Sequence, residues 1–122
     1  MFEVSTDMIL FDKFKYIFLD VDGVVLQSIR CVCDILNDYY KKDLSPQNIV
    51  SWDFKEFDNN ITSKEIEDIF DSVYFFDNVK FYDGVIDFIN KYEHKIICVT
   101  KGRDRNIELK KQLFQYFCLC LS

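Results

Sequence analysis

The sequence predicts an α/β domain built on a parallel β-sheet with helices packed around it. Two short and almost continuously apolar runs, residues 15–20 and 95–100, are typical of strands that are buried on both faces of such a sheet. Helical patterns follow each run, and the order strand, helices, strand, helix is the order of parallel α/β folds. We therefore expect a Rossmann-like parallel sheet, in a single domain of 122 residues.

Amphipathic patterns place the helices of this core. An apolar stripe predicts a helix over residues 28–41, directly after the first strand. A second pattern predicts a helix over residues 83–92, before the second strand. A last helix is expected to begin at Asp104 or Asn106 and to run towards Phe117.

Residues 43–79 are expected to form a small helical cap inserted into a core of residues 15–42 and 80–122. Ser45 followed by Pro46 is typical of a helix start, because proline fits the first helical position. Thr62 and Glu65 have the spacing of a capping box, and they predict a helix over residues 63–73.

Composition and charge exclude several classes of function. The chain has 21 acidic and 15 basic residues, a net charge of −6, and no basic patch to hold a nucleic-acid polymer. No apolar run approaches the roughly 20 residues that a membrane span needs. The N-terminal residues carry acids early and lack the basic region of a signal peptide. We expect a soluble, cytoplasmic protein.

The cysteines do not predict a disulfide framework or a zinc site. Their number is odd, and the two C-x-C pairs are spaced more closely than the ligands of structural zinc sites. We expect the five side chains to act as small hydrophobic groups. They are Cys31, Cys33, Cys98, Cys118 and Cys120.

Both predicted strands end in polar residues. Asp20 and Asp22 follow the first strand, and Thr100 and Lys101 follow the second. The carboxyl ends of parallel strands meet at one edge of a sheet, where ligands of α/β folds bind. One carboxylate there could act as a nucleophile and bind a hard cation while the other transfers protons. Gly23 would allow a sharp turn beside a bound phosphate. Alternatively, Asp-Val-Asp-Gly is only a polar turn.

The residues around these carboxylates resemble a known family. Residues 17–25, IFLDVDGVV, resemble the first motif of the haloacid dehalogenase superfamily of phosphatases. The resemblance implies that Asp20 attacks phosphorus to form an aspartyl-phosphate and that Asp22 is the general acid and base. It also implies Mg²⁺, bound by Asp20 and by the backbone carbonyl of Asp22. Residues 96–100 resemble the second motif, whose hydroxyl group, here that of Thr100, contacts the phosphoryl group.

The third motif of that superfamily is a lysine that neutralises phosphate charge and steadies the nucleophile. Lys110 is the best match in position, with Lys111 beside it. Two adjacent lysines on a helix are also typical of a solvated surface. Lys101, next to Thr100, could contact the phosphate instead.

A narrower resemblance is to the 5'(3')-deoxyribonucleotidase family. The matching pieces are short residue pairs in and beside the insertion: Ser45-Pro46, Trp52-Asp53, Phe75-Phe76 and Asp83-Gly84. In that family aromatic residues of the cap pack on the base of the nucleotide. The resemblance implies a 5'-nucleotidase, with a nucleoside monophosphate as substrate. Phe75 occupies the place of such an aromatic residue, and Trp52 or Phe54 could assist it. Alternatively, these side chains are only the core of the cap.

The resemblance covers roughly residues 15–117 and lacks the family's fourth motif. That motif is an acidic pair after a further strand, and it supplies the remaining metal ligands. We therefore expect a shortened version of a longer enzyme, with an exposed sheet edge that a second copy or a partner could cover. A second hypothesis is a non-catalytic remnant that binds phosphate or a partner. The sequence leaves open whether the chain is active and which nucleotide it takes.

Overall fold

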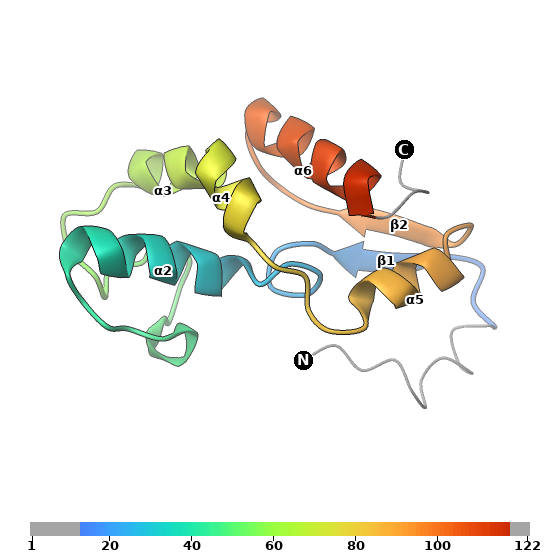
Figure 1. Cartoon of the computed structure of the whole chain (residues 1–122), viewed down its shortest axis with the longest axis horizontal. Helices are drawn as coiled ribbons and strands as arrows, with labels where there is room; N and C mark the ends of the chain where they lie inside the picture. The colour runs from blue at the N-terminus through green and yellow to red at the C-terminus, as the bar shows by residue number, and fades with distance from the viewer. Residues whose placement is uncertain (1–12, 118–122) are drawn as a thin grey trace.

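The computed structural model describes residues 13–117, which form a mixed α/β fold with a two-stranded parallel sheet and five α-helices (Figure 1). This confirms the predicted α/β class. The strands are β1 (Ile17–Asp20) and β2 (Ile96–Val99). The helices are α2 (Ser28–Tyr40), the short 3₁₀ helix η1 (Pro46–Asn48), α3 (Ser63–Phe70), α4 (Val73–Asn78), α5 (Val85–Lys91) and α6 (Asp104–Phe117). None of the helices described is long and apolar enough to cross a membrane.

The sheet brings the ends of its two strands to the same edge. β1 and β2 run parallel in a register that pairs Ile17 with Ile96 and Asp20 with Val99. The Val21 N–H group continues the pairing by donating to the Val99 carbonyl oxygen at 3.2 Å. The residues that follow each strand therefore lie next to each other, although nearly 80 residues separate them in the sequence.

Only one face of the sheet is buried among the residues described, so the prediction of strands buried on both faces is wrong for this part of the chain. Ile17 and Leu19 point into the core, whereas Phe18 between them is 66% exposed. Val99 is also exposed. The alternation follows from strand geometry, because successive side chains point to opposite faces and helices cover just one of them.

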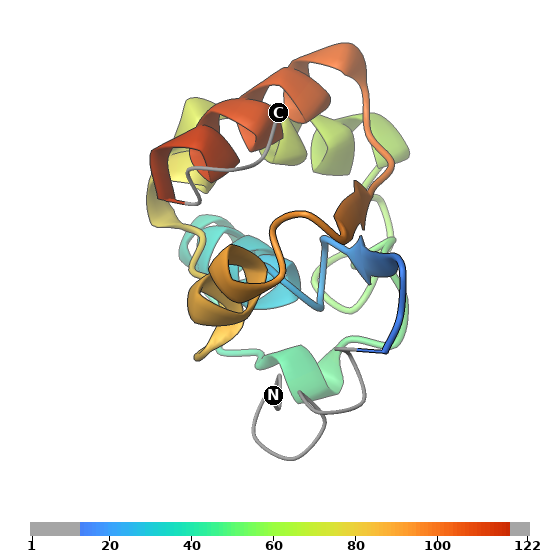
Figure 2. The same cartoon turned by 90° about the vertical axis from the view of Figure 1, so that its right-hand side faces the viewer.

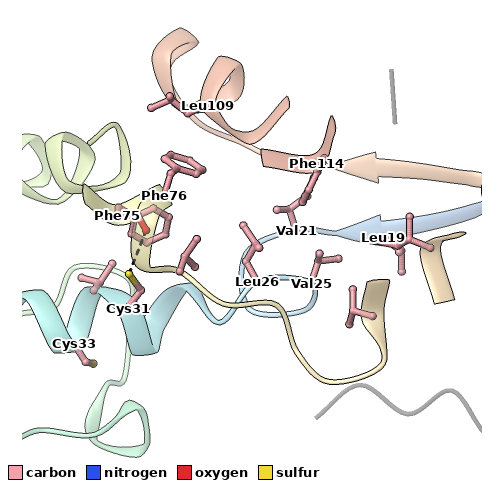
Figure 3. Close-up of a cluster of buried hydrophobic side chains, with 14 of the residues drawn as sticks. Leu19, Val21, Val25, Leu26, Cys31, Cys33, Phe75, Phe76, Leu109 and Phe114 are labelled. Carbon is pink, nitrogen blue, oxygen red and sulfur yellow. Dashed lines mark hydrogen bonds between the residues drawn. The ribbon is translucent and has the colours of Figure 1, made fainter. Parts of the chain in front are cut away.

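The hydrophobic core connects the sheet to the helices through the segment after β1 (Figure 3). Val21, Val25 and Leu26 of this segment have no exposed surface. Helix α4 packs against α2, α3 and α6, and it adds Phe75 and Phe76 to the core. The insertion thus shares its core with the rest of the domain.

The insertion departs from its predicted helices at two points. The capping box forms, since the Glu65 N–H donates to Thr62 Oγ1 at 3.2 Å and the Thr62 N–H donates to Glu65 Oε2 at 3.4 Å. However, α3 ends at Phe70, and Ser72 then starts α4 by accepting a hydrogen bond from the Phe75 N–H. The predicted helix over residues 63–73 therefore ends three residues early, at Phe70, and Ser72, a favourable N-cap residue, starts a further helix that was not predicted from the sequence. The start at Pro46 produces only one 3₁₀ turn.

Phe75→Ala should lower the free energy of unfolding by about 3–5 kcal/mol, because it removes a fully buried ring and leaves a cavity. The ring contacts Phe70 and Phe76, with centroids 5.1 Å away in each case. Urea unfolding followed by circular dichroism measures the change. The neighbouring Tyr74 is 64% exposed, and Tyr74→Ala should cost less than about 0.5 kcal/mol. Equal effects of the two substitutions would contradict the placement of Phe75 in the core.

Candidate active site

A tight loop after β1 fixes the two predicted carboxylates. The carbonyl oxygen of Val21 accepts hydrogen bonds from the N–H groups of residues 24, 25 and 26, and the Gly23 N–H donates to the Leu26 carbonyl oxygen at 2.9 Å. Gly23 has a φ of +84°, which a residue with a side chain rarely adopts. The loop therefore holds the backbone of Asp22 in one position beside the end of β1.

The carboxylate of Asp22 is held by two buried donors. Ser28 Oγ donates to Oδ1 at 2.7 Å, and Lys110 Nζ donates to Oδ2 at 2.7 Å. Ser28 opens α2 and is fully buried, and the Lys110 side chain is only 3% exposed. Because both oxygens of Asp22 have a fixed partner, the orientation of this carboxylate is set by α2 and α6 together.

Lys110 also joins the ends of the two strands. Besides Asp22, its ammonium group donates to Thr100 Oγ1 at 2.5 Å and to the Lys101 carbonyl oxygen at 3.2 Å. The structure thus brings together three of the residues singled out from the sequence: Asp22, Thr100 and Lys110. Lys111 is exposed, and Lys101 has an exposed side chain at the edge of the same site.

Asp20 lies on the open face of the sheet, at the end of β1. Its side chain is exposed, and within residues 13–117 its carboxylate has no hydrogen-bond or ion-pair partner. In the family motif the lysine steadies the nucleophile, whereas here Lys110 contacts Asp22. The two carboxylates are therefore in different environments: Asp20 is open to a ligand, and Asp22 is held by charge and hydrogen bonds.

A cavity of about 880 Å³ opens over these strand ends, which is the size of a small-molecule site. Asp20, Asp22 and Thr100 lie at its core side. The end of α3 and residues 103–106, at the start of α6, form another part of its lining. The lining residues from these parts of the chain are Ile66, Glu67, Phe70, Asp71, Arg103 and Asn106.

The two aromatic residues proposed as substrate contacts lie in different places. Trp52 lines the cavity, is 46% exposed, and stands over Gly23, where an added Cβ would come within 3.8 Å of its ring. Phe75 has no exposed surface and is not among the residues that line the cavity; it lies in the core. Phe54, the other aromatic named for this role, is also fully buried.

Sequence reasoning missed several residues of the cavity wall, among them Phe70 and Arg103. The ring of Phe70 lies 6.0 Å from that of Trp52, centroid to centroid. Ile66 and Phe70 are spaced i, i+4, which places them on one face of α3, and that spacing was a usable signal. Arg103 had no signal of this kind, because its partners lie in a distant part of the chain.

The site offers oxygen ligands of the kind that Mg²⁺ takes, and a magnesium ion there would need phosphate and water as further ligands. The open donors are the Asp20 carboxylate and the Asp22 backbone carbonyl; the Asp22 carboxylate is taken by Ser28 and Lys110. No group of three or more His, Cys, Asp or Glu side chains that could hold a metal occurs within residues 13–117. Mg²⁺ commonly binds through one or two protein oxygens and keeps waters and substrate phosphate as its other ligands.

The two buried cysteines of α2 do not supply an alternative chemistry. Cys31 and Cys33 are buried, and burial raises the pKa of each thiol to about 11. These thiols stay protonated near neutral pH, so they are poor nucleophiles and poor metal ligands. Cys118 and Cys120 lie outside the described residues.

Comparisons of the chain with protein-family models, with curated proteins and with solved structures found no match.

Proposed function

We propose that the chain is a magnesium-dependent phosphatase of the haloacid dehalogenase type, with a Rossmann-like core and a small helical cap. The observation that carries this proposal is the contact of Asp22, Lys110 and Thr100 beside the open Asp20 carboxylate. Asp22 and Lys110 are 88 residues apart in the sequence. A polar turn without function would not need a buried lysine from α6 on its second carboxylate.

The proposed reaction has two steps. Asp20 attacks phosphorus in line, the bond from phosphorus to the ester oxygen breaks, and Asp22 gives a proton to the leaving oxygen. Water then attacks the aspartyl-phosphate, Asp22 takes its proton, and phosphate leaves with Asp20 restored. Ser28 and Lys110 keep Asp22 in position through both steps.

Charge stabilisation would be shared between the protein and the metal. Thr100 and the ammonium group of Lys101 would face the phosphoryl oxygens, where charge is concentrated during phosphoryl transfer. Lys110, whose ammonium group donates to Asp22, Thr100 and the Lys101 carbonyl oxygen, would hold these groups in place. Mg²⁺, held by Asp20 and the carbonyl of Asp22 together with the phosphate, would neutralise further charge on these oxygens.

The cavity supports a nucleoside 5'-monophosphate as the substrate, with a deoxyribonucleotide as the first candidate. Its volume of about 880 Å³ accommodates a mononucleotide. Trp52 and Phe70 form an aromatic wall on which a base could stack. The carboxylate pair at the strand ends would then receive the 5'-phosphate.

Phosphate release from a panel of ribo- and deoxyribonucleoside 5'-monophosphates tests the proposal. We expect release that requires Mg²⁺, stops with EDTA and differs among the bases by at least about 5-fold, since a base on an aromatic wall contributes binding energy. A simple aryl phosphate in the panel tests whether the base matters. Absence of release from folded protein with every ester would contradict the phosphatase proposal.

A second candidate function, phosphate binding without catalysis, is favoured by one observation. The two open oxygen donors, from Asp20 and Asp22, form a small ligand set for a catalytic metal. A binding protein would be stabilised by inorganic phosphate, seen as a rise in melting temperature, and would release no phosphate from any ester. Hydrolysis of any ester in the panel would exclude this alternative.

A further inference from the structure

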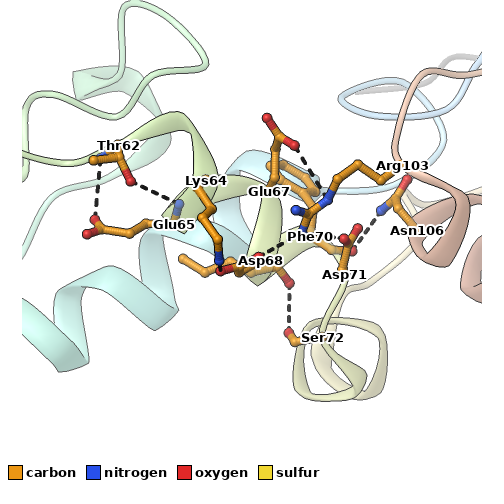
Figure 4. Close-up of polar contacts among 11 residues, drawn as sticks. Thr62, Lys64, Glu65, Glu67, Asp68, Phe70, Asp71, Ser72, Arg103 and Asn106 are labelled. Carbon is orange, nitrogen blue, oxygen red and sulfur yellow. Dashed lines mark hydrogen bonds and ion pairs between the residues drawn. The ribbon is translucent and has the colours of Figure 1, made fainter.

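Arg103 connects the core to the insertion through a cluster of acidic side chains (Figure 4). It lies directly before α6, and its guanidinium group contacts three carboxylates at the end of α3. Nε lies 3.4 Å from Glu67 Oε2, and Nη2 lies 2.8 Å from Asp68 Oδ1. Nη2 also forms an ion pair with Asp71, whose side chain is only 15% exposed. We call Arg103 and these three acids the Arg103 cluster.

A buried hydrogen bond supports the Arg103 cluster from the same helix. Asn106 is 2% exposed, and its Nδ2 donates to the Phe70 carbonyl oxygen at 2.7 Å. The last turn of α3 is thus connected to the first turn of α6 by both charge and a hydrogen bond. Helices α3, α4 and α6 lie on the same side of the molecule in both overall views, and α4 packs against each of the other two (Figures 1 and 2).

The last turn of α3 needs a cation from elsewhere in the chain. It carries Glu67 and Asp68, with Asp71 as the C-cap, and it has no basic residue. The C-terminal end of a helix carries a partial negative charge, so acids there are unfavourable. Among the residues that the structure describes, Lys64 pairs only with Asp68, at 2.8 Å. Hydrogen bonds from Lys64 and Arg103 hold the pKa of Asp68 below its usual range.

The Arg103 cluster borders the cavity of the proposed active site. Glu67, Phe70 and Asp71 line the cavity from α3, and Arg103 and Asn106 line it from the core. Trp52 contacts Phe70, so a shift of α3 would also change the surroundings of Trp52. The contacts of Arg103 and Asn106 with the end of α3 therefore help to set the shape of the part of the cavity wall that α3 forms.

We propose that Arg103 is a positioning residue that holds the α3 wall of the cavity against the core and thereby sets the affinity for substrate; the second part rests on the proposed function. Without Arg103, three acids would remain at the end of α3, and the wall would separate from α6. Arg103 reaches no reacting group itself, because its guanidinium is occupied by the three acids.

Arg103→Met tests the positioning role, and Arg105→Met is its matched control. Arg105 lies two residues further, in the first turn of α6, and is about as exposed; within residues 13–117 it pairs only with Glu108, at 3.7 Å. Hydrogen exchange should be several-fold faster at residues 63–72 in Arg103→Met, because the end of α3 opens more often. Arg105→Met should exchange like the native protein. Equal exchange of the two variants at residues 63–72 would overturn the proposal.

Trp52 is the single tryptophan of the chain and gives a second readout. Acrylamide should quench its fluorescence more strongly in Arg103→Met than in Arg105→Met. Asp71→Asn removes the least exposed acid of the Arg103 cluster and should also make hydrogen exchange at residues 63–72 faster. This variant replaces Arg103→Met in the test if Arg103→Met does not fold. Arg103→Lys should restore exchange only in part, because one ammonium group cannot contact three carboxylates as the forked guanidinium does.

Kinetics test the part of the proposal that concerns substrate affinity. If the chain releases phosphate, Arg103→Met should raise KM by roughly 5- to 10-fold and leave kcat within about 2-fold, as expected for a lost binding contribution. Faster exchange with an unchanged KM would overturn the link to affinity. Absence of phosphatase activity would contradict the proposed function. The positioning role would still be tested, because the hydrogen-exchange measurement does not depend on activity.

Discussion

Asp20→Asn should lower the rate of magnesium-dependent phosphate release by on the order of 10³-fold or more, because an amide cannot attack phosphorus as a carboxylate does. The substitution should leave the fold intact. Asp20 is exposed and has no hydrogen-bond partner among the residues described, so its amide replaces no structural contact. The measurement is the initial rate of phosphate release at saturating nucleotide, with the melting temperature of each protein recorded alongside.

The matched control for this prediction is Asp87→Asn. Asp87 is an exposed acid on α5, so its substitution makes the same change in net charge away from the cavity. We expect it to keep the native rate within about 2-fold, as most surface substitutions do. If the Asp20→Asn variant releases phosphate as fast as the Asp87→Asn variant, Asp20 is excluded as the nucleophile. A parallel loss in both variants would indicate a general effect of charge.

Lys110→Met should lower the free energy of unfolding by roughly 3 kcal/mol, the cost of removing one partner of a buried ion pair. The substitution removes the ammonium donor from Asp22 Oδ2, Thr100 Oγ1 and the Lys101 carbonyl oxygen. The Lys101 carbonyl oxygen keeps a 3.4 Å hydrogen bond from Thr100 Oγ1. Methionine preserves most of the buried aliphatic volume, so the loss reports on the ammonium group. Urea unfolding of each variant gives the free energies.

Two further variants isolate the contribution of the ion pair. Lys111 is the exposed neighbour on the same helix, and Lys111→Met should change stability by less than about 0.5 kcal/mol. In a double-mutant cycle of Lys110→Met with Asp22→Asn, we expect a coupling energy of about 1–3 kcal/mol. A coupling energy near zero would mean that Lys110 and Asp22 do not stabilise each other in solution.

Local patterns predicted those parts of the fold that depend on neighbours in sequence. Thr62 and Glu65 form their capping box because its partners are three residues apart, so nothing distant needs to be known. The helix over residues 63–73 was predicted too long for the same reason. The apolar pattern continues past Phe70, but the N-cap residue Ser72 decides where the second of the two helices begins.

The sequence also predicted which strand ends would meet, because parallel strands place their carboxyl ends at one edge of a sheet. Asp20 and Asp22 are thereby brought next to Thr100. Burial on both faces was not a safe inference from apolar composition alone. Phe18 is as apolar as its neighbours in β1, yet the helices of the described residues cover only the other face.

The tertiary structure decided which side chains of each type reach the cavity. The sequence offered three lysines as candidates: Lys110, Lys111 and Lys101. The rotation of α6 buries Lys110 against Asp22, whereas Lys111 faces solvent. In the same way, the packing of α4 buries Phe75 in the core, whereas Trp52 stays at the cavity.

What the sequence by itself determined is the α/β class, the parallel pair of strands and the polar groups at their ends. These follow from hydrophobic periodicity and from the chirality and direction of the backbone, which act over short stretches of chain. Only the tertiary structure decided the environment of each charge, such as Lys110 on Asp22 and Arg103 on the acids of α3. Such contacts depend on how the helices pack, and that packing results from the sum of many distant side-chain volumes.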